Sequence, residues 1–334
     1  MMRNIDRMSR GPAIDTTGRL RLMRNVDEQS SLSAMESTVL SPTGVDRRIP
    51  TWASGLVAGL ARDLPLVVTR EAVATRLAEV GLERDVDASI TELRRLGWLV
   101  GLPLKGTWAF IPPGQDAVTD PYLPLRAWRA RDPNAEFFLA GEAAAWHLGY
   151  LDRRPEGPTA VWKPAALRLP DGLRPHVSVV RLTWHDLAAK ELRPTTALLA
   201  RRQLDIVNWA SGLPAFGPEA LIVQLAARPA SFQPWADLLV HLDQVVADCD
   251  DDRLARLLLD QTSSAWQRAA YLLHSGSQPS RGIALINRKA TGSMPKVCFE
   301  HPDIERDEAR TLWVSQYHLV DRLIAPLRGL VGKA

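Results

Sequence analysis

Apolar residues recur at helical spacing in three consecutive stretches, residues 47–65, 67–81 and 83–97. This spacing predicts three helices, with Pro65 ending the first, Thr69 as N-cap of the second and glycines closing the second and third. Two short apolar stretches follow, Trp98–Leu102 and Thr107–Ile111, and the turn "PLKG" joins them. They predict a β-hairpin. Three helices followed by a hairpin are typical of a winged helix-turn-helix domain.

The pattern changes after a linker rich in Pro, Gly and Asp, "PPGQDAVTDPYLP". An alanine-rich helix is expected over "FFLAGEAAAWHLGYL", closed by Gly149, and strands over "PTAVWKP" and "HVSVVRLTW". From about residue 216 the pattern is mostly helical. Helices are expected over "PEALIVQLAARP", "PWADLLVHLDQVVADC", "DRLARLLLDQTSSAWQRAAYLLHSG" and, at the end of the chain, "DEARTLWVSQYHLVDRLIAPLRGLV".

These patterns predict the fold class α/β (α+β) and three parts. Residues 1–46 are polar and without period, which predicts a disordered tail. Residues 47–115 are expected to form the winged helix-turn-helix domain, and residues 116–334 a larger mixed α/β domain.

Composition narrows the class of protein only slightly. The chain has 334 residues, 46% of them hydrophobic and 24% charged, which suits a globular protein of two domains. The net charge of +3 does not by itself identify a nucleic-acid binder, because such binding needs clustered charge. Two distant cysteines, Cys249 and Cys298, favour a reduced compartment and show no zinc spacing. No apolar run reaches the length of about 18–20 residues that a membrane span needs, so we expect a cytoplasmic protein without membrane contact.

The third predicted helix separates its apolar and polar residues. Val86, Ile90, Leu93 and Leu96 share one side of a helical wheel. A recognition helix packs such a side on its neighbour and offers the other side to the major groove. The residues expected to meet DNA are the outward and flanking ones of the helix together with the lysine at the hairpin tip: Arg84, Asp87, Thr91, Arg94, Arg95 and Lys105.

Each residue type in that set suits a DNA contact. Arginine can pair with guanine or phosphate, and threonine can contact a thymine methyl group or a phosphate. A lysine beside the groove adds affinity without sequence information. Trp98 and Trp108 are expected in the hairpin core rather than stacked on bases. A merely solvated helix face, or a winged helix that binds protein, are the alternatives.

Several stretches resemble AbiEi-type antitoxins, the antitoxin half of AbiE abortive-infection toxin–antitoxin systems. "KGTWAFIPP" is similar to the exit of the wing in that family, and "FFLAGEAAAWHLGYLDRRP" to a later segment. In this later segment Gly141, Ala144, Leu148 and Gly149 hold matching places. "GLPAFGPEALIVQLAARP" and "WQRAAYLLHSG" are similar to two further family segments. The likeness covers about residues 47 to 290 and departs from the family at Glu142, Ala143 and Ala220, where serine, serine and arginine are frequent.

The resemblance implies that the N-terminal domain binds double-stranded operator DNA and represses its own operon, with self-association on DNA as an option. It also implies that the C-terminal domain neutralises a nucleotidyltransferase-like toxin encoded beside it. Alternatives are a C-terminal enzyme that modifies the toxin or a nucleotide, and a stand-alone winged-helix regulator.

No stretch predicts a catalytic, cofactor or metal site, so we expect a protein that is not an enzyme. His185 and Asp186 would point to opposite faces of a strand, and Asp186 is better explained as a helix N-cap. His147 is expected in a core or groove. The acidic run Asp248–Arg253 lacks the glycine and the late glutamate of a calcium loop and predicts acids at a helix N-terminus.

Two further segments carry arginines. "HSGSQPSRG", which contains Arg281, lacks the P-loop spacing and is expected to be a flexible connection. The basic residues from Arg193 to Arg202 are expected to form a solvated loop, with phosphate or toxin contacts as the alternative.

Overall fold

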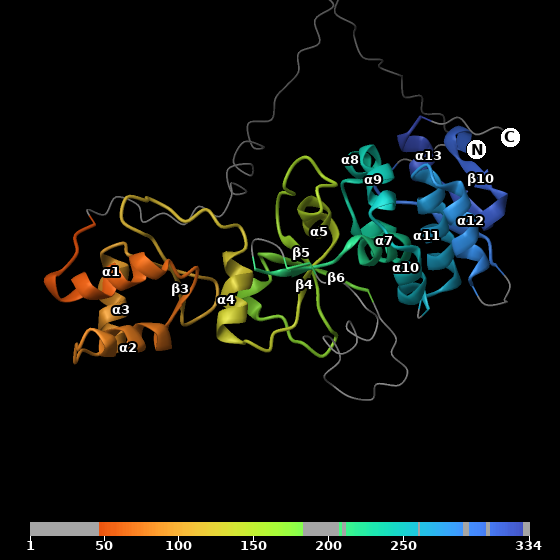
Figure 1. Cartoon of the computed structure of the whole chain (residues 1–334). Helices are drawn as coiled ribbons and strands as arrows, with labels where there is room; N and C mark the ends of the chain where they lie inside the picture. The colour runs from red at the N-terminus through yellow and green to blue at the C-terminus, as the bar shows by residue number, and fades with distance from the viewer. Residues whose placement is uncertain are drawn as a thin grey trace, which may run out of the picture. The chain divides into compact units, whose positions relative to one another are not determined.

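The computed structural model describes residues 47–182, 207–208, 212–259, 261–289, 294–304 and 308–329 (Figure 1). Three of the sequence predictions fall outside these residues. They are the disordered tail of residues 1–46, the pair His185 and Asp186, and the basic segment from Arg193 to Arg202.

The three predicted N-terminal helices are present. They are α1 (Ser54–Asp63), α2 (Arg70–Glu79) and α3 (Val86–Arg95), with a short 3-10 turn at Thr51–Ala53 before them. The Thr69 side chain accepts a hydrogen bond from the Ala72 backbone N–H at 3.2 Å, which confirms the predicted N-cap of α2. Gly81 follows α2 at a φ of +67° and Gly97 follows α3 at +72°, a conformation that glycine adopts at low cost.

The predicted hairpin is also present and is joined by a third, short strand. The strands are β1 (Val68–Thr69), β2 (Leu99–Gly101) and β3 (Thr107–Phe110), in the antiparallel order β1-β3-β2. Side chains of the three helices and the hairpin share one cluster, in which Leu56, Leu93 and Trp98 are buried. This cluster explains why the apolar spacing predicted the elements correctly, since the same residues form the core.

A mixed five-stranded sheet lies at the centre of the following part. Its strands are β4 (Phe138–Leu139), β5 (Thr159–Trp162), β6 (Val177–Val180), β7 (Val207–Asn208) and β8 (Pro214–Ala215), in the order β6-β5-β4-β8-β7. Strand β4 pairs antiparallel with β5 and parallel with β8. Two helices accompany the sheet, α4 (Leu123–Arg131) and α5 (Gly141–His147).

The predicted helix over "FFLAGEAAAWHLGYL" is wrong over its first four residues. Phe138 and Leu139 form the buried central strand β4, and the helix α5 begins only at Gly141. The apolar run fits a strand or a helix equally well, and pairing with β5 and β8 decided for the strand.

Helices dominate the rest of the chain, as predicted. They are α7 (Pro218–Ala227), α8 (Trp235–Val240), α9 (Leu242–Ala247), α10 (Asp251–Leu258), α11 (Ser263–Ser275) and α12 (Pro279–Asn287). The expected flexible connection after residue 274 is wrong. Only a tight turn with Ser277 at a φ of +61° separates α11 from α12, and Pro279 occupies the first turn of α12.

The predicted C-terminal helix is wrong as well. The segment forms β10 (Leu312–Val314), β11 (Leu319–Asp321) and only a short helix, α13 (Ile324–Leu327), with 3-10 turns at Glu308–Arg310 and Ser315–Tyr317. Strand β11 pairs parallel with β9 (Val297–Phe299) and antiparallel with β10. This partner strand lies about twenty residues earlier in the chain, so helical spacing within the segment could not reveal it.

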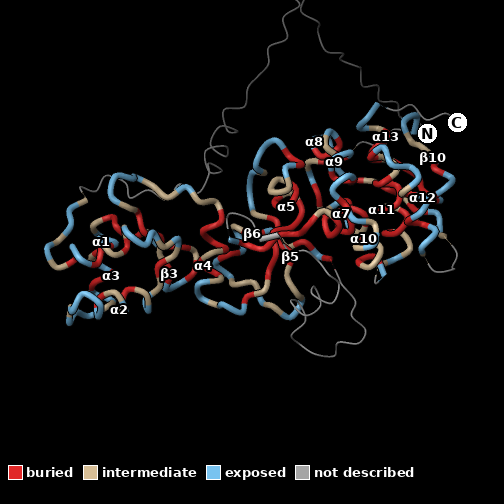
Figure 2. The backbone as a smooth tube through the Cα atoms, viewed as in Figure 1, coloured by how far each residue is buried: buried red, intermediate tan, exposed pale blue. Residues whose placement is uncertain are grey.

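Burial is concentrated on the sheet and on the helices that follow it (Figure 2). Helix α7 is buried along nearly its whole length, from Glu219 to Ala226. A second cluster joins Leu102 and Leu104 of the hairpin turn to Leu123, Phe137 and Leu173. The hairpin therefore packs on the α/β part through apolar side chains.

Candidate nucleic-acid interface

Helix α3 keeps its polar face in solvent. Asp85 caps the helix by accepting a hydrogen bond from the Ala88 N–H at 2.7 Å, and Ile90 and Leu93 are buried beneath it. The six predicted DNA-binding residues are all exposed: Arg84, Asp87, Thr91, Arg94, Arg95 and Lys105. A DNA contact requires an exposed side chain, and all six meet that requirement.

Arg84 and Asp87 are nevertheless engaged within the chain. The Arg84 guanidinium lies over the Trp52 ring, 3.9 Å from its centroid, and pairs with Glu92 at 2.8 Å. Asp87 accepts two hydrogen bonds from Arg70, at 2.9 and 3.1 Å, and these bonds lower the pKa of its carboxyl group. These contacts orient α3 against α2 and the residues before α1.

Arg94, Arg95 and Lys105 differ from Arg84, since within the described residues no ion-pair partner faces them. The exposed charged residues at the C-terminal end of α3 that have no such partner are therefore the cations Arg94 and Arg95. The Thr91 hydroxyl donates to the Asp87 carbonyl oxygen at 2.8 Å. The nine basic and seven acidic residues of the segment 47–115 give it little net charge, so this local cluster carries the electrostatic argument.

The hairpin tip is held firmly while its lysine stays exposed. The Thr107 hydroxyl donates to the Leu104 carbonyl oxygen at 2.6 Å, and Gly106 has a φ of +83°. Leu104 is buried, whereas Lys105 points away from the cluster into solvent. The tip can therefore present one cation in a fixed place.

The tryptophans support the hairpin, as predicted for Trp98. Its ring stacks on Phe110 at 6.4 Å and is 3% exposed, and its indole N–H donates to the Arg48 carbonyl oxygen at 3.0 Å. Trp108 is half-buried. The sequence prediction missed the role of Arg47, which lies 4.2 Å from the Trp98 ring centroid and donates to the Ile111 carbonyl oxygen.

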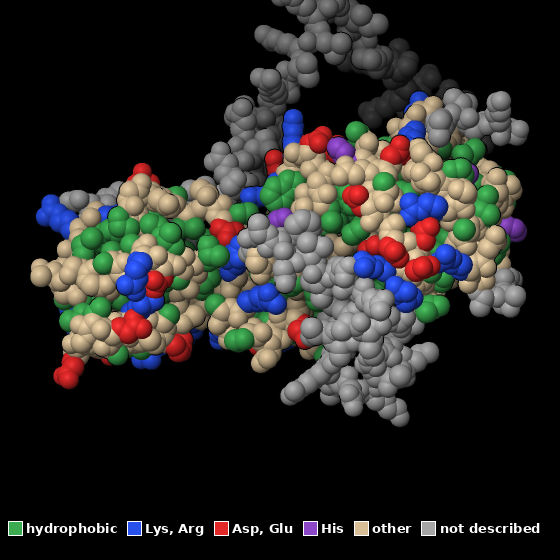
Figure 3. Space-filling model, in the orientation of Figure 1, with side chains coloured by type: hydrophobic (Ala, Val, Ile, Leu, Met, Phe, Trp, Pro, Cys, Tyr) green, Lys and Arg blue, Asp and Glu red, His purple; other side chains and the backbone are tan. Residues whose placement is uncertain are grey.

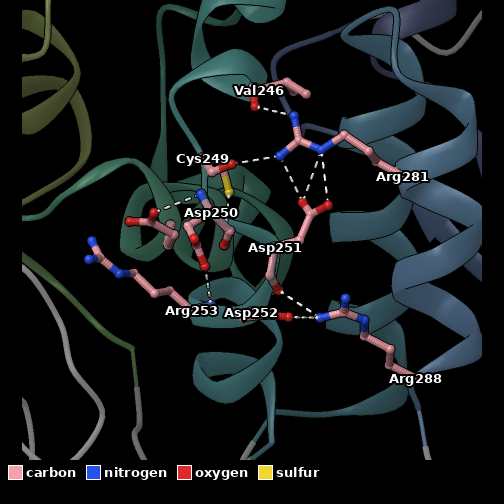
Figure 4. A network of polar contacts seen from close by, with 9 residues as sticks. Val246, Cys249, Asp250, Asp251, Asp252, Arg253, Arg281 and Arg288 are labelled. Atoms are coloured by element: carbon pink, nitrogen blue, oxygen red, sulfur yellow. Dashed lines mark hydrogen bonds and ion pairs between the residues drawn. The ribbon is translucent and has the colours of Figure 1, made fainter.

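The acidic run after α9 is an N-terminal helix cap, as predicted. Asp250 accepts a hydrogen bond from the Arg253 N–H at 2.8 Å, and Asp251 and Asp252 occupy the first turn of α10 (Figure 4). Among the described residues, no group of three or more His, Cys, Asp or Glu side chains could hold a metal ion.

Arg281 joins α12 to α10 and to the end of α9. Its guanidinium donates to both carboxylate oxygens of Asp251, and to the carbonyl oxygens of Val246 at 2.7 Å and Cys249 at 2.6 Å (Figure 4). On the face seen in Figure 3, Lys and Arg side chains over α10 to α12 likewise lie next to Asp and Glu. These arginines are already neutralised within the chain, so they are poor candidates for a phosphate site.

Other polar contacts in the α/β part are structural. Gln224, fully buried in α7, accepts a hydrogen bond from the Gly141 N–H at 2.8 Å. Arg268 of α11 donates to the carbonyl oxygens of Cys298 and Ala226. His147 is half-buried beside Tyr122, as expected for a core or groove histidine, and burial lowers the pKa of its imidazole.

The residues that depart from the family pattern lie around α5 and α7. The Glu142 carboxylate accepts a hydrogen bond from the Gln233 N–H at 2.9 Å, and burial raises its pKa. Ala143 and Ala220 are buried. Ala143 and Ala220 are therefore packing positions, whereas Glu142 links α5 to the residues before α8 by a hydrogen bond.

None of the helices that the structure describes is long and apolar enough to cross a membrane.

Comparison with known proteins identifies the class of this protein. The model of the AbiEi antitoxin C-terminal domain matches residues 136–275, from the residues before β4 to the end of α11. Residues 136–275 therefore belong to the family of AbiEi antitoxin C-terminal domains. The match begins after the N-terminal helices and hairpin, so it says nothing about those elements.

A solved structure extends the likeness over most of the chain. The RV2827C protein from Mycobacterium tuberculosis, known from a crystal structure, is 59% identical with a TM-score of 0.74. The alignment covers 88% of this chain and 99% of that chain. A search of curated proteins found no match.

Proposed function

We propose that this protein is a DNA-binding autorepressor that serves as the antitoxin of a nucleotidyltransferase-like toxin. In this proposal residues 47–115 are a winged helix-turn-helix domain that binds the operator of its own operon. The α/β domain neutralises the toxin by a route that needs no catalysis of its own.

The observation that carries the DNA-binding part is the exposed cationic group on α3 and the hairpin. Arg94 and Arg95 lie at the end of α3 and Lys105 at the tip of the turn before β3, without a counter-ion among the described residues. The element order supports it, because in a winged helix the last helix enters the major groove and the hairpin lies beside it.

The contacts within the chain support a smaller set of proposed DNA-binding residues. Arg94, Arg95 and Lys105 are the residues that we assign to phosphates or base edges, with Thr91 beside them on the same exposed face. Arg84 and Asp87 are assigned to positioning α3, because each already has a partner within the chain. The antitoxin part rests on the family of residues 136–275.

Salt-dependent binding tests the DNA-binding part. The double variant Arg95→Ala/Lys105→Ala and the wild type are titrated, over a range of salt, onto a duplex that covers the promoter of the protein's own operon. Each lost phosphate contact lowers the slope of log affinity against log salt by about 0.9, so we expect a fall of roughly 2.

A matched control removes two cations elsewhere. Arg153→Ala/Lys289→Ala changes an exposed and a half-buried cation of the α/β domain, neither of which has an ion-pair partner within the described part of the chain. We expect it to leave the slope at the wild-type value, with circular dichroism confirming that all three proteins are folded. An unchanged slope in the Arg95/Lys105 variant would refute the recognition surface.

A further inference from the structure

The loop between β5 and β6 packs directly on the hairpin turn. A Cβ atom built on Gly172 of this loop would lie 2.3 Å from the Pro103 carbonyl oxygen, so the two backbones touch and only glycine fits. Leu173 enters the same apolar cluster as Leu102 and Leu104. Lys105 is two residues from Pro103, which places their Cα atoms within about 7.6 Å of each other.

This loop carries two exposed arginines. The side chains of Arg168 and Arg174 are 84% and 69% exposed, and they lie 3.6 and 2.8 Å from the carboxylate of Asp171. Two guanidinium groups share one carboxylate, so the group keeps a net positive charge. Ion pairs this exposed are weak, and a phosphate can replace the carboxylate as partner.

A third cation comes from α4. Arg131 is exposed and donates a hydrogen bond to the Lys105 carbonyl oxygen at 3.0 Å. The hairpin turn thus carries Lys105, has Arg131 of α4 bonded to it, and packs at Pro103 on the loop that carries the other two arginines. The apolar residues of that loop, Leu167 and Leu169, pack on the cluster below, so its outer face is polar.

We propose that the AbiEi domain itself contacts the DNA backbone, through Arg168 and Arg174, beside the hairpin tip. This inference rests on the proposed DNA-binding function and deepens it. A duplex carries one phosphate charge per about 1.7 Å of its axis, so a duplex that covers Lys105 brings several phosphates over the adjoining loop. The loop contributes affinity and register, while the sequence is read by α3.

The test compares Arg168→Ala/Arg174→Ala with the wild type on two duplexes, the protein's own promoter and an unrelated duplex of equal length. Backbone contacts carry no sequence information, so we expect the same fold-loss of affinity on both duplexes. The salt slope is expected to fall by up to about 1.8, which is 0.9 for each contact.

Asp171→Asn is expected to change DNA affinity in the opposite direction. It keeps the shape of the side chain but removes the shared carboxylate, so we expect tighter binding to both duplexes and a slope no smaller than that of the wild type. A merely structural role of the loop would not improve binding. Weaker binding by Asp171→Asn, or weaker binding by the arginine variant with an unchanged slope, would overturn the inference.

The result also separates this inference from the function on which it rests. If Arg95→Ala/Lys105→Ala lowers the slope and Arg168→Ala/Arg174→Ala does not, the loop makes no DNA contact while the DNA-binding function stands. If neither variant changes the slope, the DNA-binding function itself fails.

Discussion

The exposed charged residues that were predicted to meet DNA, on α3 and just before it, divide into two groups by their partners. Arg84 pairs with Glu92 and lies over the Trp52 ring. Asp87 pairs with Arg70. Arg94 and Arg95 face solvent without an ion pair in the described part of the chain. A helical wheel cannot separate these groups, because it places residues around a helix without showing what neighbouring elements offer them.

The backbone conformation and the close neighbours of Gly141 favour glycine at this position. Its φ is +51°, and a Cβ atom there would lie 3.1 Å from the Gln224 amide nitrogen and 3.3 Å from the Ala160 methyl carbon. We expect Gly141→Ala to lower the free energy of unfolding by about 1–3 kcal/mol, from backbone strain and crowding together. Urea unfolding followed by tryptophan fluorescence measures this loss.

Gly101→Ala is the matched control for that substitution. Gly101 lies in β2, and a Cβ atom there would meet nothing within 4 Å. Its free energy of unfolding should stay within about 0.5 kcal/mol of the wild type. Equal losses in both variants would show that Gly141 is not a strained position.

At the scale of elements, caps and glycine stops follow directly from the sequence, whereas strand pairing does not. Thr69, Gly81 and the acids before α10 are placed as predicted. The strands β10 and β11 were missed because they are defined by contacts with each other and with β9. The backbone hydrogen bonds of a helix join residues four apart, so local spacing reflects them. The backbone hydrogen bonds of a strand join it to another segment, which local spacing does not show.

The N-cap of α10 gives a prediction for stability and its pH dependence. Asp250→Ala removes the acceptor for the Arg253 N–H and is expected to cost about 1 kcal/mol, whereas Asp250→Asn keeps an acceptor and costs less. The hydrogen bond from the Arg253 backbone lowers the pKa of Asp250 in the folded state. The charged form is therefore favoured by folding.

The sign of the pH effect follows from that direction. A lowered folded-state pKa adds stability that is present above the unfolded-state pKa of about 3.9 and is lost as the pH falls through the folded-state value. The stability difference between the wild type and Asp250→Asn should thus shrink as the pH falls below about 4, in urea titrations at several pH values. A difference that grows toward acid pH would contradict the cap assignment.

At the scale of the whole molecule, the hairpin and the α/β part share an apolar cluster, yet the family match covers only the latter. We therefore expect the two proposed activities to be separable. If the proposed nucleotidyltransferase-like toxin is co-expressed in a growth assay, Arg95→Ala/Lys105→Ala should protect cells as well as the wild type does. The substituted side chains lie outside residues 136–275 and outside the core.

The empty vector is the control without protection, and the wild type is the control with full protection. Immunoblotting establishes equal protein levels. Loss of protection at an equal protein level would show that neutralisation depends on the proposed DNA surface.

The sequence by itself determined the three N-terminal helices and the hairpin, most of the later helices and the exposed polar face of α3. These features depend on residues within a few positions of one another, so their spacing is enough. Only the tertiary structure decided which cations of α3 and the hairpin lack an ion-pair partner among the described residues, where β4, β10 and β11 form, and that Gly172 meets Pro103 at the hairpin turn. Those outcomes depend on contacts between residues far apart in the chain, and the spacing of neighbouring residues carries no record of them.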